Sequence, residues 1–65
     1  MKLTNREYEI LELLSDGNSD KQIAELLKIS RRTVQTHVGR VYMKMGVNNR
    51  VSAVTMFLKH ISMSA

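Results

Sequence analysis

The sequence lacks cysteine and proline, and its aromatic residues are limited to two tyrosines and one phenylalanine. Without cysteine, the chain can form neither a disulfide framework nor a thiolate metal site. The two histidines, His37 and His60, are 23 positions apart and fit no zinc-ligand spacing, so we expect no metal ion and no other cofactor. The aromatic rings are too few to stack the bases of a single-stranded nucleic acid.

Long hydrophobic runs are also missing. No apolar stretch approaches the ~18 residues of a membrane-spanning helix, and the segment from Met1 to Thr4 is not an apolar signal region. A length of 65 residues corresponds to a single domain, residues 1–65. We therefore expect one cytoplasmic domain that does not contact membranes. The sequence leaves open whether it acts alone or as part of a longer protein.

Acidic residues are absent from the second half of the chain. All six lie within residues 1–29, together with four basic residues, whereas residues 30–65 contain six basic residues and no acid. The net charge of +4 is therefore concentrated in the C-terminal half. This asymmetry favours a polyanionic partner over the alternative of a solvated helix face.

Helix-start and helix-end signals divide the chain into four predicted helices and no strands. The predicted N-caps are Thr4, Ser19, Ser30 and Asn49. Glu7 and Gln22 stand three residues after the first two caps and complete capping boxes, while Gly17 and Gly46 end the first and third helices. The helices should contain about 11, 9, 15 and 12 residues, and the last residues, from Ser62, should fray. The predicted fold is an all-α, four-helix bundle.

The second and third predicted helices are joined by the turn Lys28-Ile29-Ser30, which is the arrangement of a helix-turn-helix. Ala24 is small where the two helices must approach each other. The residues available to close a core around that crossing are Ile23, Leu27, Ile29 and Val34. Lys28 occupies the turn position where this motif often has glycine, so the generic signal is incomplete.

The third predicted helix, once its apolar face is set aside, presents residues that suit duplex DNA. They are Arg31, Arg32, Gln35, Thr36, Gly39 and Arg40. A helix fits the major groove, where glutamine can pair with adenine, arginine with guanine, and a threonine methyl with a thymine methyl. Gly39 costs about 0.5–1 kcal/mol relative to alanine in a helix interior. Either a close approach to the DNA backbone or local crowding and tolerance within the protein would explain it.

These residues carry a resemblance to the LuxR-type, or GerE-type, helix-turn-helix domain of bacterial transcription factors. The opening block of that family is similar to Leu3-Thr4-Asn5-Arg6-Glu7. Its central and closing blocks are similar to Lys21-Gln22-Ile23-Ala24, Thr33-Val34, His37-Val38, Lys44-Met45-Gly46-Val47, Arg50 and Ala53-Val54. Gln22 and Met45 depart from the pattern, since Glu and Leu are usual there. The helix-turn-helix of sigma-factor domain four is similar over the first three helices.

The resemblance implies a transcription regulator that binds double-stranded DNA sequence-specifically, with its third helix in the major groove. The implied base-reading residues are Arg32, Gln35, Thr36 and Gly39. The implied phosphate contacts are Lys21, Arg31, Thr33, Arg40, Lys44 and Asn48. The fourth helix should form a homodimer on DNA, with candidate contacts at Val51, Val54, Thr55 and Leu58. RNA polymerase is a further candidate partner.

The sequence leaves three interpretations open. His37 is either a half-buried structural residue or a phosphate donor, since no nucleophile or carboxylate lies at a spacing that would make it catalytic. Glu7 either pairs with Arg50 across the first and fourth helices or only completes its helix cap. The incomplete turn and Gly39 motivate an alternative function, in which the scaffold is a protein-interaction domain that does not read DNA. No residue pattern indicates an enzyme.

Overall fold

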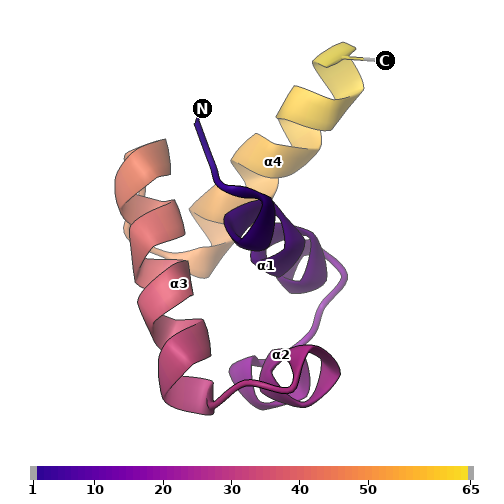
Figure 1. The fold of residues 1–65 in the computed structure, drawn as a ribbon. Helices are drawn as coiled ribbons and strands as arrows, with labels where there is room; N and C mark the ends of the chain where they lie inside the picture. Colours follow the sequence, from indigo (N-terminus) through magenta and orange to yellow (C-terminus); the bar gives the residue numbers. More distant parts are fainter. Residues whose placement is uncertain (1, 65) are drawn as a thin grey trace.

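The computed structural model describes the backbone of residues 2–64 and the side chains of residues 2–61. Over the described backbone the chain forms four helices and no strand: α1 (Asn5–Ser15), α2 (Asp20–Leu27), α3 (Arg31–Met45) and α4 (Arg50–Ser64). α1 contacts each of the other three helices and lies between α3 and α4, with α2 beside the N-terminal end of α3 (Figure 1). The all-α fold predicted from the sequence is confirmed.

The helices begin where the capping residues predicted they would. Thr4 Oγ1 accepts a hydrogen bond from the Glu7 N–H at 3.1 Å, and Glu7 Oε1 accepts one from the Thr4 N–H at 2.8 Å. Ser19 and Gln22 repeat this reciprocal pair ahead of α2, at 3.2 and 2.8 Å. Such pairs satisfy N–H groups that have no partner inside the helix. The remaining two caps are formed by Ser30, to the Thr33 N–H, and Asn49, to the Ser52 N–H.

The helix ends also follow the sequence, except in α4. Gly17 and Gly46 adopt the left-handed conformation after α1 and α3, as predicted. α4 continues to Ser64, beyond the predicted length of about 12 residues. The backbone is helical up to Ser64, since no glycine or proline interrupts the helix there, and fraying from Ser62 stays a prediction; Ala65 lies outside the described residues.

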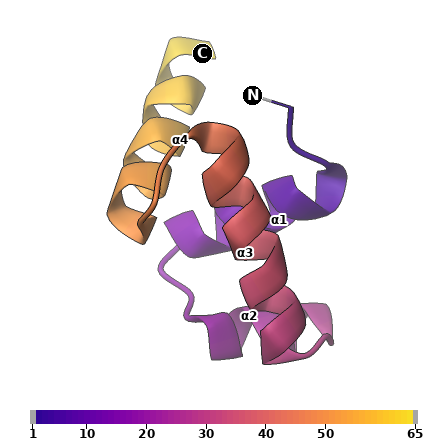
Figure 2. The ribbon, with the colours of Figure 1, turned by 90° about the vertical axis from the view of Figure 1, so that its left-hand side faces the viewer.

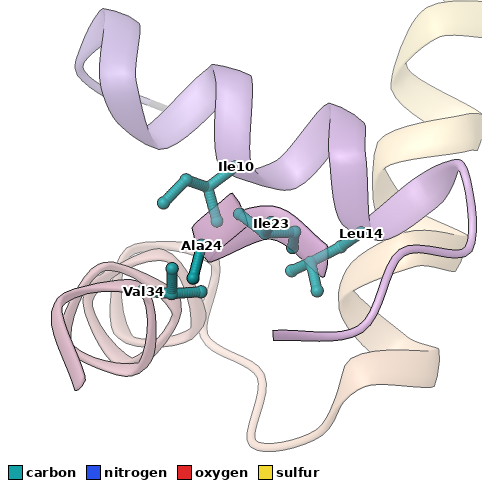
Figure 3. Close-up of a cluster of buried hydrophobic side chains, with 5 residues drawn as sticks. All are labelled: Ile10, Leu14, Ile23, Ala24 and Val34. Atoms are coloured by element: carbon teal, nitrogen blue, oxygen red, sulfur yellow. The ribbon is translucent and has the colours of Figure 1, made fainter. Parts of the chain in front are cut away.

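Two buried apolar clusters hold the helices together, and α1 contributes to both. The first joins α1, α2 and α3 and consists of Ile10, Leu14, Ile23, Ala24 and Val34 (Figure 3). Leu27 and Ile29 pack against it, as predicted for the helix crossing. The second joins α1, α3 and α4 and consists of Leu11, Val41, Met45, Ala53 and Phe57. Because both clusters use the inner face of α3, its opposite face is left at the surface, as Figure 2 shows.

Candidate nucleic-acid interface

The turn between α2 and α3 closes without a glycine. Lys28 adopts the left-handed conformation, with φ 57° and ψ 45°, and its N–H donates to the Ala24 carbonyl. The Ile29 N–H donates to the same carbonyl at 3.1 Å. A left-handed residue other than glycine costs roughly 1–2 kcal/mol, so the packing of Ile29 and its neighbours must offset that cost. The absent glycine therefore does not disturb the helix-turn-helix.

The outer side of α3 presents an exposed, cationic surface. We call it the open face of α3, and it consists of Arg31, Arg32, Gln35, Thr36 and Arg40, all of them exposed. Among the described residues, none of its three guanidinium groups makes a hydrogen bond or an ion pair. α3 contains no acidic residue, so nothing on the helix itself neutralises this charge.

The two threonine hydroxyls on α3 are occupied by local bonds, one to the N-cap and one within the helix. Thr33 Oγ1 lies 2.8 Å from Ser30 Oγ, and Thr36 Oγ1 donates to the Arg32 carbonyl at 3.1 Å. The Thr36 hydroxyl is therefore bound to its own backbone, which leaves its methyl group as the distinctive contact surface. That arrangement suits the apolar contact with a thymine methyl expected from the sequence.

Gly39 borders a shallow hollow of about 410 Å³ beside the open face. The hollow is lined by Leu14, Asp20, Gln35, Val38, Gly39, Tyr42 and Arg50. Burial raises the pKa of the Tyr42 hydroxyl in its wall. A Cβ atom added to Gly39 would meet no other atom within 4 Å, so crowding within the chain does not explain the glycine.

Lys44 of α3 and Arg50 of α4 each make a charge-assisted contact with α1, Lys44 at its N-terminal end and Arg50 at its C-terminal end. We call these two contacts together the polar joint, and it consists of Glu7, Lys44, Arg50 and the carbonyls of Leu14 and Asn18. The Lys44 ammonium donates to Glu7 Oε1 at 2.6 Å, and Glu7 is only 2% exposed. This hydrogen bond, followed by the one from the Thr4 N–H, lowers the pKa of Glu7 from 4.5 to about 2.

Arg50 holds the other half of the polar joint. Its Nη2 donates to the Asn18 carbonyl at 2.7 Å and to the Leu14 carbonyl at 3.1 Å. These carbonyls belong to the end of α1 and the loop after it, so a residue at the start of α4 caps the C-terminus of α1. The predicted alternative of a Glu7–Arg50 pair is wrong, because Lys44 occupies the Glu7 carboxylate. Glu7 completes its cap and also forms this ion pair.

The remaining residues expected to contact phosphates lie at the surface. Lys21, in the first turn of α2, and Thr33 are exposed. Asn48 is exposed in the loop before α4, where its Oδ1 accepts from Asn49 Nδ2 at 3.0 Å. Lys44 differs from them, since its charge is already shared with Glu7 although its side chain is 40% exposed.

The expected dimer residues separate into two groups on α4. Val51 and Leu58 are 75% and 53% exposed, and Thr55 is exposed between them on the same helix face. Val54 is half-buried and packs against the first core cluster. Val54 therefore contributes to the core of its own chain.

A hollow of about 670 Å³ lies between α1 and α4 and is bordered by Tyr8, Phe57 and Ile61 among others. Sequence reasoning missed this hollow, because it depends on how two distant helices meet. No group of three potential metal ligands occurs among the described residues. No helix within the described range is long and apolar enough to cross a membrane.

The chain is similar in sequence to known bacterial regulatory proteins. The family described as "Bacterial regulatory proteins, luxR family" matches residues 1–57. The transcriptional regulatory protein DegU of Brevibacillus brevis is 47% identical over 58 residues, which cover 89% of this chain and 25% of DegU. The nitrate/nitrite response regulator protein NarP of Escherichia coli is 44% identical over 57 residues, covering 88% of this chain and 26% of NarP.

One solved structure is similar to this chain in both fold and sequence. The response regulator ChrA of a haem-sensing two-component system superposes with a TM-score of 0.86 at 43% sequence identity. The match covers 92% of this chain and 30% of ChrA. The chain therefore spans a quarter to a third of the length of these three similar proteins.

Proposed function

Because the chain belongs to the luxR family of bacterial regulatory proteins, we propose that it binds double-stranded DNA sequence-specifically. It does so as a transcription regulator or as the DNA-binding part of one, in the bacterial cytoplasm. The observation that carries the proposal is the open face of α3, where three guanidinium groups are exposed and unpaired among the described residues. Such groups bind phosphates and release counterions, which supplies most of the affinity of proteins for DNA.

α3 is the helix that enters the major groove in this proposal. It lies at the edge of the molecule, and its exposed side faces away from α1 (Figure 2). The groove is about 12 Å wide and admits one helix. Arg32, Gln35 and Thr36 then contact base edges, while Gly39 contributes a close approach and no side chain.

The phosphate contacts surround that helix. Five exposed residues supply them: Lys21, Arg31, Thr33, Arg40 and Asn48. Lys44 belongs to the same proposed set, but its ammonium must be shared between a phosphate and Glu7. Phosphate contacts fix the position of a protein on the duplex and carry no sequence information.

We propose that α4 forms a homodimer on DNA. Val51 and Leu58 are exposed apolar residues on one face of α4, with Thr55 between them. A symmetric contact between two copies would bury these side chains. The two half-sites, in an inverted or direct repeat, would then lie about 10 base pairs apart, which is one turn of DNA. RNA polymerase is proposed as a further partner, because DegU is named a transcriptional regulatory protein.

Gln35→Ala tests the reading of bases. A duplex is first selected by the wild-type chain from a random-sequence pool, and affinity is measured on it and on every single-base variant. We expect a loss of about 1–3 kcal/mol on the selected duplex and loss of discrimination at one base pair. Arg40→Ala is the control and should weaken all sequences alike. Equal losses for Gln35→Ala on selected and scrambled duplexes would contradict base reading.

The alternative function, a protein-interaction domain that does not read DNA, retains one supporting observation. Met43 is 81% exposed on α3, where an apolar side chain suits a protein partner better than phosphate. The turn does not support this alternative, because Lys28 forms it without glycine. The alternative requires duplex binding no tighter than that of an unrelated basic protein of equal charge.

A further inference from the structure

His37 lies on a flank of α3 that also carries three expected phosphate contacts. Thr33, His37, Arg40 and Lys44 follow one another at spacings of four, three and four residues, which places them along one side of the helix. His37 is half-buried, between the core-facing Val34 and Val41 and the exposed Arg40. The proposed function gives this histidine no role.

Neither ring nitrogen of His37 has a hydrogen-bond partner within the part of the chain that the structure describes. Nδ1 is buried there and has none. Nε2 also makes no hydrogen bond among the described residues and is not buried, so it reaches the surface. Buried N–H groups without an acceptor are rarer than buried acceptors without a donor. The lone pair is therefore assigned to Nδ1 and the ring proton to Nε2, the nitrogen that points outward.

We propose that His37 is a DNA-backbone contact, in which Nε2–H donates a hydrogen bond to a phosphate oxygen beside Arg40. The inference rests on the proposed function, since it requires α3 to lie in the groove. A half-buried ring is held by its packing and loses little freedom on binding, unlike a lysine or arginine side chain. His37 would therefore fix the position of α3 against one strand with an uncharged donor.

The competing explanation is a histidine retained for packing alone. Buried polar atoms in native proteins are nearly always hydrogen-bonded, and a packing histidine would be expected to donate to a carbonyl or carboxylate. Within residues 2–61, whose side chains are described, His37 donates to neither. A donor that faces outward on a cationic flank is instead placed for an anion outside the chain.

Two substitutions separate these explanations. His37→Gln places an amide N–H near the position of Nε2, whereas His37→Asn places its amide near the buried Nδ1. Binding is measured on the duplex selected by the wild-type chain and on a scrambled duplex, over a range of salt concentrations. We expect His37→Asn to bind both duplexes about tenfold more weakly and His37→Gln to stay within about twofold of wild type.

The salt dependence identifies the kind of contact. An uncharged donor releases no counterion, so the slope of log K against log salt should be unchanged in His37→Asn. Arg40→Ala is the matched control on the same flank and should reduce the slope by about 0.9. As a measurement on the wild-type chain, 15N NMR of the His37 ring should show Nε2–H in the free protein and slower exchange of that proton with duplex.

Three results would overturn the inference. The first is wild-type affinity in a folded His37→Asn variant. The second is equal weakening by Asn and Gln with an equal loss of unfolding free energy, which would indicate packing alone. The third is an Nε2 proton whose exchange is unchanged by DNA. Failure of the proposed function looks different, because the wild-type chain itself would then select no duplex from the random pool.

Discussion

The polar joint and the open face of α3 use the same kinds of side chain for opposite purposes. In the polar joint every charged group has a partner inside the chain: Lys44 binds Glu7, and Arg50 binds two carbonyls. On the open face, the guanidinium groups of Arg31, Arg32 and Arg40 have none among the described residues. The acid-free half of the chain therefore offers a ligand less positive charge than its composition suggests.

The largest expected contrast between the two regions is in stability. Arg50→Ala removes the charged donor from the carbonyls of Leu14 and Asn18, of which Leu14 keeps the Gly17 N–H. Hydrogen bonds to a charged group are strong, so we expect a loss of about 2 kcal/mol of unfolding free energy. Arg40→Ala, on the open face, should change it by no more than about 0.5 kcal/mol. Urea denaturation of both variants checks this, and equal effects would remove the distinction between the regions.

Acid should weaken the polar joint next. The pKa of Glu7 lies at about 2 in the folded chain against 4.5 ordinarily, so its ionised form stabilises the fold above pH 4.5, and that stability is lost as the pH falls toward 2. Glu7→Gln keeps a capping side chain, as Gln22 does in α2, and removes only the charge. The difference in unfolding free energy between wild type and Glu7→Gln should therefore shrink between pH 4.5 and 2. A constant difference would show that the Lys44 pair contributes nothing to it.

For DNA affinity the order should be the opposite of that for stability: substitutions on the open face should have larger effects than substitutions in the polar joint. We expect Arg32→Ala and Arg40→Ala each to weaken duplex binding about fivefold or more and, where the contact is to a phosphate, to lower the salt slope by about 0.9. Arg50→Ala, in the fraction that remains folded, should leave the slope at its wild-type value. Fluorescence anisotropy titrations at several salt concentrations provide the measurement. A reduced slope for Arg50→Ala would mean that the polar joint also contacts DNA.

The smallest expected effect concerns Gly39, at the edge of the open face. Gly39→Ala should stabilise the chain by about 0.5–1 kcal/mol, because the added methyl meets no atom and alanine favours a helix. If α3 approaches DNA closely at this point, the same variant binds duplex more weakly than wild type. Thermal unfolding and duplex titration of the one variant give both answers, and unchanged affinity would assign Gly39 to tolerance.

Much of the fold could be predicted because its signals are local. The capping boxes at Thr4 and Ser19 each involve residues three positions apart, so sequence proximity alone brings the partners together. The apolar spacing of Val34, Val41 and Met45 likewise fixes which side of α3 is buried, and with it which side is exposed. The residues of the open face are the polar residues of α3 that this spacing leaves on the exposed side.

Other features could not be predicted because they depend on distant segments. Glu7 and Lys44 are 37 positions apart, and no local pattern distinguishes Lys44 from Arg50 as the partner of Glu7. The left-handed conformation of Lys28 could not be predicted from the sequence either, because residue propensities assign that conformation to glycine. The orphaned Nδ1 of His37 depends on how closely the packed core covers one edge of its ring.

The sequence by itself determined four helices, their starting residues, the buried side of each and the cationic character of α3, because these depend on contacts within about one or two helical turns. Tertiary structure alone decided which charges remain available to a ligand. Lys44 and Arg50 are drawn into the polar joint because α1 packs against both α3 and α4 and presents a buried carboxylate to one and the carbonyls of its C-terminal end to the other. Arg31, Arg32 and Arg40 have no partner among the described residues, because no helix of that part of the chain covers the outer side of α3.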